Sequence, residues 1–184
     1  MNRKVSLILK IAAVSFVTLH LGGYVAADKS SDYSANQSTK NERAKRMHKK
    51  LTTNMMVDDV NRTVDFYSDV LGFEFVMGVR EDSQETVTAK QNDQILGFAM
   101  VKCNNVEMMF QTKKSLAREI PEFSGMKIGG SVTFYVQVEN VDGLYEELKD
   151  KVTIIKDLQT TFYGMREFYI RDCNGYVLTF AQGA

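Results

Sequence analysis

Two stretches of the chain, residues 51–60 and 132–141, repeat one pattern of apolar and polar positions. In each stretch, the apolar positions are typical of a strand, and they lead into acidic or Asn side chains that cap helices. The apolar residues that follow recur three and four positions apart. This spacing predicts helices over residues 60–70 and 141–149.

A second pair of matching segments, residues 103–110 and 173–180, ends each repeat. Both begin with Cys and a turn dipeptide, and the second dipeptide, Asn174-Gly175, is the stronger signal for a two-residue hairpin. Further strand patterns lie between helix and hairpin, at residues 73–80, 95–102, 152–157 and 167–171.

The repeats predict an α+β fold with two tandem βαβββ modules, at about residues 51–112 and 130–182. Alternation along the strands separates two faces. The apolar face, which we expect beneath the helices, holds Met108, Phe110, Phe134, Val136, Val138, Leu178 and Phe180. The opposite face is mixed and holds Thr52, Asn54, Met56, Glu107, Met109, Gln111, Thr133, Tyr135, Gln137, Tyr169 and Thr179. A mixed face lines a ligand cavity, or else forms a second core layer or a dimer interface.

The residues before the repeats have a different character. Residues 1–27 combine a positive start, an apolar run and a small-residue cleavage site, Val25-Ala26-Ala27, which is the order found in a signal peptide. An uncleaved signal anchor is the alternative. Residues 28–50 are rich in Ser, Asn and Lys, which predicts a flexible linker ahead of a domain spanning residues 51–184. We therefore expect an exported protein, periplasmic or secreted, with membrane contact only through an uncleaved signal segment.

Charge and histidine content narrow the chemistry of residues 51–184. They carry 13 basic and 20 acidic groups, a net charge of −7, although the whole chain is neutral. Such a balance argues against nucleic-acid binding, which needs excess positive charge. Both histidines, His20 and His48, precede residue 51. The domain alone therefore cannot build a catalytic triad with histidine or a zinc site with imidazole ligands.

Two local motifs resemble a known family. Residues 56–73 read MVDDVNRTVDFYSDVLGF, and residues 171–176 read RDCNGY. The first resembles the opening strand, helix and "FY…vLGF" exit of the vicinal oxygen chelate superfamily, which includes glyoxalase I, extradiol dioxygenases, fosfomycin-resistance proteins and bleomycin-binding proteins. The second resembles its "rDPdGy" turn, with Cys173 in place of the proline. The resemblance covers roughly residues 51–182. It implies curved mixed sheets around a cleft, and a homodimer.

The same resemblance locates the positions that hold a divalent metal ion in the metal-dependent members. Here these positions fall on Thr52, Met109, Thr133 and Thr179. Three hydroxyls and a thioether are poor ligands for a hard or borderline cation. The chain therefore is similar to the metal-free branch, and we expect no metal and no other cofactor.

This interpretation favours a cleft that binds a small organic molecule without transforming it, so enzymatic activity is left open but not favoured. Tyrosine rings and carboxylates suit an aromatic or cationic guest. The expected cleft residues are Asn54, Met56, Glu107, Met109, Gln111, Thr133, Tyr135, Gln137, Tyr163, Glu167, Tyr169 and Thr179.

Two other functions remain open. One is a metal-dependent lyase or dioxygenase with a rearranged site that uses Glu107 and Glu167. The other is a non-catalytic dimerisation module. Cys103 and Cys173 are structural thiols, a disulfide or reactive groups.

Overall fold

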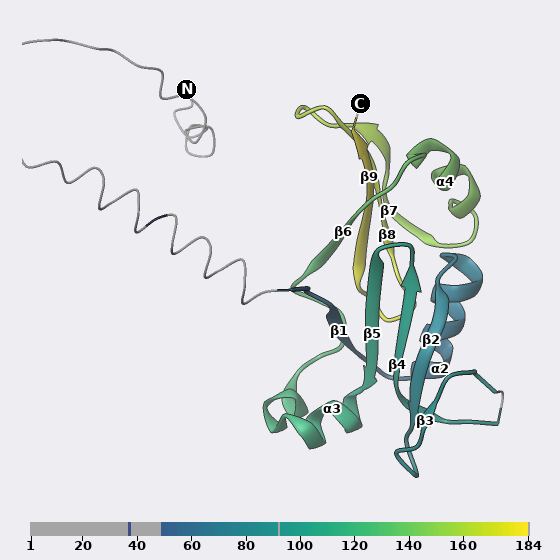
Figure 1. The fold of residues 1–184 in the computed structure, drawn as a ribbon. Helices are drawn as coiled ribbons and strands as arrows, with labels where there is room; N and C mark the ends of the chain where they lie inside the picture. The colour runs from purple at the N-terminus through teal and green to yellow at the C-terminus, as the bar shows by residue number, and fades with distance from the viewer. Residues whose placement is uncertain (1–36, 38–48, 92, 184) are drawn as a thin grey trace, which may run out of the picture. The chain divides into compact units, whose positions relative to one another are not determined.

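The computed structural model describes residue 37, residues 49–91 and residues 93–183 (Figure 1). The predicted signal peptide lies outside the described residues, as does the predicted linker apart from residues 37, 49 and 50. Within the described ranges, no helix is both long enough and apolar enough to cross a membrane.

The strands form two mixed sheets, and each of the two modules supplies one of them. Sheet A has the order β1–β5–β4–β2–β3, with β1 at Thr53–Val57, β2 at Glu74–Arg80, β3 at Thr86–Val87, β4 at Leu96–Cys103 and β5 at Val106–Thr112. Sheet B has the order β6–β9–β8–β7, with β6 at Thr133–Gln137, β7 at Thr153–Thr160, β8 at Met165–Arg171 and β9 at Val177–Gly183. In both sheets the first strand of the module pairs in parallel with the last. The α+β fold with two tandem modules is confirmed.

Both predicted helices are present, each beginning at a side-chain cap. Asp59 Oδ1 accepts a hydrogen bond from the Arg62 amide at 2.9 Å, and Asn140 Oδ1 accepts one from the Gly143 amide at 3.0 Å. Helix α2 (Val60–Asp65) continues into the π-helical segment η1 (Phe66–Val70). Helix α4 (Val141–Leu148) is the second. Figure 1 shows α2 and α4 on the same side of the sheets.

One hydrophobic core joins the two modules. It contains the predicted inner-face residues Met108, Phe110, Leu178 and Phe180, and Phe134, Val136 and Val138 pack against it. Phe110 and Phe180 occupy equivalent places in β5 and β9, and both are buried. The prediction that this face lies beneath the helices is therefore confirmed.

A polar contact also joins the modules, through the turn between β8 and β9. Buried Asp172 accepts hydrogen bonds from the Asn174 and Tyr176 amides at 2.9 and 2.7 Å, and from the Tyr67 hydroxyl at 3.1 Å. The Tyr176 hydroxyl donates to the Met56 carbonyl at 2.9 Å. We call Asp172, Tyr67 and Tyr176 the inter-module latch. Burial raises the pKa of both Asp172 and Tyr67.

The β8–β9 turn corrects one local expectation. Asn174-Gly175, the stronger signal for a two-residue hairpin, lies within a five-residue connection between paired Arg171 and Val177. Asp172 Oδ1 accepts hydrogen bonds from the Asn174 and Tyr176 amides, and these bonds hold the longer connection in place. The weaker signal, Asn104-Asn105, forms the two-residue connection, between paired Cys103 and Val106.

Two helical segments between the modules were not predicted. They are α3 (Lys113–Glu119) and the 3₁₀ segment η2 (Pro121–Gly125). Helix α3 is capped by Thr112, whose hydroxyl accepts from the Ser115 amide at 3.2 Å. Of the three states considered for the cysteines, the structure shows Cys103 and Cys173 as free thiols.

Candidate functional site

The faces of the two sheets opposite the core, which we call the open faces, carry the predicted cleft residues. Strand register arranges sheet A into two rows, read from β1 to β2. One row, which we call the methionine row, is Asn54, Met109, Met100 and Met77. The row beside it is Met56, Gln111, Phe98 and Val79.

Sheet B has two corresponding rows, read from β6 to β7. One, which we call the tyrosine row, is Tyr135, Thr179, Tyr169 and Lys156. The row beside it is Gln137, Ala181, Glu167 and Gln159.

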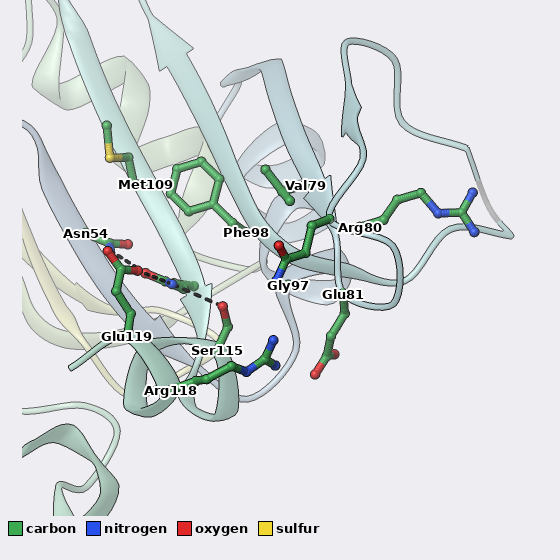
Figure 2. A pocket seen from close by; sticks show the side chains of 12 residues that line it. Asn54, Val79, Arg80, Glu81, Gly97, Phe98, Met109, Ser115, Arg118 and Glu119 are labelled. Carbon is green, nitrogen blue, oxygen red and sulfur yellow. Dashed lines mark hydrogen bonds between the residues drawn. The ribbon is translucent and has the colours of Figure 1, made fainter. Parts of the chain in front are cut away.

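The open face of sheet A holds a cavity of about 520 Å³ where the strands meet α3 (Figure 2). Val79, Phe98 and Met109 supply its apolar lining. Its polar lining comes from Asn54, Arg80 and Gln111 on the sheet, from Glu81 and Gln84 just after β2, and from Ser115, Arg118 and Glu119 on α3. A cavity of this size, with a mixed polar and apolar lining, is within the range that holds small organic molecules.

Gln111 connects the cavity floor to α3. Its Oε1 accepts a hydrogen bond from Asn54 Nδ2 at 2.8 Å, and its Nε2 donates to Ser115 Oγ and Glu119 Oε2, both at 3.1 Å. Figure 2 shows these bonds converging below Met109. The network fixes both ends of the Gln111 amide, so the amide is held in one orientation.

The open face of sheet B carries a different arrangement, which we call the Glu167 cluster. Glu167 has no exposed surface. Its Oε1 accepts hydrogen bonds from the hydroxyls of Tyr169 at 2.5 Å and Tyr163 at 2.9 Å, and its Oε2 accepts one from Tyr135 at 3.3 Å. Three phenols therefore surround one buried carboxylate.

The cluster raises the pKa of all three tyrosines. For Tyr169 and Tyr163 the main cause is the hydrogen bond to Glu167, which stabilises the protonated phenol. For Tyr135 the main cause is desolvation, and the charge of Glu167 adds to it. The tyrosines are therefore neutral donors at physiological pH.

The structure brings some predicted cleft residues together and separates others. Asn54, Met109 and Gln111 line the cavity, and Tyr135, Tyr163, Glu167 and Tyr169 form the Glu167 cluster. Of the remaining predicted residues, Met56 and Thr179 are buried, the latter in the tyrosine row. Glu107 forms an ion pair with Lys50. Thr133 and Gln137 are exposed on β6.

The positions implied for a metal ion are divided between the two sheets, and none of them is the strand partner of another. Met109 pairs with Asn54, two positions beyond Thr52, and Thr52 itself precedes β1. Thr179 stands opposite Tyr135, and Thr133 stands opposite Val177. Among residues 37, 49–91 and 93–183, no group of three His, Cys, Asp or Glu side chains is placed to hold a metal ion. Hydroxyl and thioether groups in this arrangement do not fit a hard or borderline cation.

Sequence reasoning missed nine of the twelve residues that line the cavity: Val79, Arg80, Glu81, Gln84, Gly97, Phe98, Ser115, Arg118 and Glu119. Alternation along β4 was a usable signal, since it places Phe98 on the same face as Met100. A register shift between Phe75 and Met77 hides the equivalent signal in β2.

Known proteins include both sequence relatives of this chain and solved structures with a similar fold. The chain is 26% identical over 135 residues to the bleomycin resistance proteins of Geobacillus stearothermophilus and Staphylococcus aureus, covering 68% of this chain and 90% of each relative. Solved structures with a similar fold include a protein of unknown function from Agrobacterium tumefaciens, with 20% identity and a TM-score of 0.57 over 74% of this chain and 95% of that one. A superfamily member from Sphaerobacter thermophilus has 19% identity and a TM-score of 0.56 over 74% and 98% of the two chains.

The solved structures share the fold of this chain. The family model for the Glyoxalase/Bleomycin resistance protein/Dioxygenase superfamily matches residues 49–180. The chain belongs to that superfamily, as the two sequence motifs predicted.

Proposed function

We propose that this protein is exported and binds a small organic molecule, aromatic or cationic, without a metal ion. The observation that carries the proposal is the cavity of about 520 Å³ on the open face of sheet A, with Phe98 and Met109 in its lining. Methionine and aromatic side chains adapt to flat apolar guests. The names of the bleomycin resistance relatives supply a first ligand to test.

The poor donor set at Thr52, Met109, Thr133 and Thr179 supports binding without a metal. Glu107 and Glu167, the two carboxylates of the alternative metalloenzyme, lie on different sheets. Glu107 forms an ion pair with Lys50, and Glu167 is surrounded by tyrosines. Each carboxylate is therefore already engaged with a partner of its own.

The test is isothermal titration of the full-length chain with bleomycin after treatment with a chelator. We expect binding that chelation does not weaken. Phe98→Ala should weaken it about 10-fold, because an aromatic contact in the lining is lost. The matched control is Phe75→Ala, which removes the same ring from the core side of sheet A and should leave affinity unchanged.

Loss of binding on chelation, restored by a divalent metal, would overturn the metal-free proposal. Tightly held stoichiometric metal that Glu107→Gln removes would support the alternative enzyme instead. If bleomycin does not bind at all, and Phe98→Ala and wild type are indistinguishable, the assignment of the cavity is wrong.

The homodimer is part of the proposal. It is supported by Met77, Met100 and Met109, which are half-buried on an open face that a second copy would cover. Sedimentation equilibrium should give twice the chain mass. A single-chain mass at all concentrations would contradict the dimer, and would also rule out the dimerisation module as the function.

A further inference from the structure

We propose that the Glu167 cluster is a binding site for an organic ammonium ion, that is, a quaternary or methylated amine. The inference rests on the proposed function, since the proposed guest is aromatic or cationic, and deepens it by naming the class of cation and assigning it to sheet B.

The cluster presents ring surface to solvent while it keeps its charge inside. Glu167 is 0% exposed, whereas Tyr135 and Tyr163 are 50% and 54% exposed. Phe162, 96% exposed, lies edge-on to Tyr163 with ring centroids 4.9 Å apart. A guest on this face therefore meets aromatic surface first and the carboxylate second.

The hydrogen bonds make these rings better partners for a cation. A phenol that donates to a carboxylate is polarised toward phenolate, which increases electron density on its ring. A cation over the ring is attracted by the ring quadrupole, and here the negative charge of Glu167 lies directly behind the hydroxyls. Both effects act in the same direction and repel an anion.

The same geometry selects an alkylated ammonium ion over a metal ion. A hard cation needs direct access to carboxylate oxygens. Three phenols already occupy the oxygens of Glu167, which has no exposed surface. A methylated ammonium ion needs no direct ligand bond, and its methyl groups pack on ring faces.

The chain itself supplies an example of the interaction. Lys156 Nζ lies 5.2 Å from the centroid of the Tyr169 ring. Lys156 and Tyr169 are paired neighbours in the tyrosine row. An ammonium group therefore already lies over one ring of the cluster, and it competes electrostatically with any cationic guest.

The test compares choline with its neutral isostere, 3,3-dimethylbutan-1-ol, by chemical-shift titration of the full-length chain. We expect choline to bind about 10-fold more tightly, as one good cation–ring contact near a buried charge predicts. The shifted resonances should be those of Tyr135, Tyr163 and their neighbours.

Five variants, one of them a control, locate the effect. Glu167→Gln keeps an acceptor for the phenols but removes the charge, and should weaken choline binding about 10-fold. Tyr135→Leu should weaken it more than Tyr135→Phe, which keeps the ring. Lys156→Met should strengthen it about 3-fold, because the internal competitor is gone. Tyr145→Phe is the matched control and should change nothing, since Tyr145 donates to Asp157 at 2.9 Å outside the cluster.

Equal affinities for choline and the neutral isostere would overturn the inference, as would weaker choline binding by Lys156→Met. The Lys156 variant keeps the test decisive if Glu167→Gln does not fold. If choline fails while bleomycin still binds in a Phe98-dependent manner, only this inference falls. If bleomycin fails as well, the proposed function falls with it.

Discussion

The two modules share their core positions and differ on their open faces. On the core side, Phe110 and Phe180 are both buried phenylalanines in one cluster. On the open side, the methionine row of sheet A corresponds strand by strand to the tyrosine row of sheet B. Phe98, in the cavity lining, corresponds to Glu167. Packing thus constrains one face of the repeat, while the other is free to acquire different chemistry.

The strongest test of the shared core is to remove one equivalent ring from each module. Phe110→Ala and Phe180→Ala should each lower the free energy of unfolding by about 3–5 kcal/mol, because each leaves a cavity in the same cluster. Urea unfolding followed by circular dichroism should remain one transition in both variants. Two separate transitions would show that the modules have independent cores.

The inter-module latch should give the next largest effect. Asp172→Ala leaves the Asn174 and Tyr176 amides and the Tyr67 hydroxyl without their acceptor, which should cost about 2–3 kcal/mol. The matched control is Asp142→Ala, which breaks an exposed ion pair with Arg166 and should cost less than about 1 kcal/mol. Equal losses in the two variants, measured by urea unfolding, would contradict the latch.

The latch also makes a prediction about pH. Burial raises the folded-state pKa of Asp172, so its contribution to stability is present below about pH 4, the range of an unfolded Asp, and is lost as pH rises through the folded-state value. The wild type should therefore lose stability relative to Asp172→Asn between pH 4 and pH 7. A constant difference across that range, measured by thermal unfolding, would exclude this titration.

The polar network of the cavity should contribute less. Gln111→Ala breaks the link from Asn54 to Ser115 and Glu119, and should cost about 1 kcal/mol. Hydrogen exchange should speed up in α3 more than in α4. The control is Gln137→Ala, an exposed residue on β6, which should leave both rates unchanged.

The smallest expected effect is on tyrosine ionisation. All six tyrosines from Tyr67 onward have raised pKa values, so their contribution to the absorbance at about 295 nm should rise only above pH 10, the ordinary tyrosine value. The stability they contribute is present below that pH and is lost above it. Glu167→Gln should move part of the curve to lower pH. A curve that overlays the wild type would show that Glu167 does not control its three phenols.

Internal repetition made most of the fold predictable. The matching segments place strands, helices and both strand faces, because a period of two residues determines which side chains share a face. Helix α3 escaped prediction, since only Leu116 among its seven residues is buried and one apolar position gives no periodicity. The register shift in β2 similarly breaks the period that would have revealed Val79.

The candidate site was predictable in composition but not in grouping. Tyr135, Tyr163, Glu167 and Tyr169 were each expected in a cleft, yet their convergence depends on the pairing of β6, β9 and β8 and on the Tyr163 turn. Likewise, the cavity needs α3 to cover the end of sheet A. Such arrangements depend on contacts between segments distant in sequence, which a local pattern does not contain.

The inter-module latch has a consequence for how the chain acquires its structure during synthesis. Tyr67 donates its hydroxyl to Asp172, 105 positions later in the chain. A nascent chain that ends before this turn has made all of α2 and sheet A, but it offers that buried phenol only the weak acceptor Met55 Sδ, at 4.0 Å. The hydrogen bonding of the first module's interior is therefore complete only when the end of the second module has been synthesised.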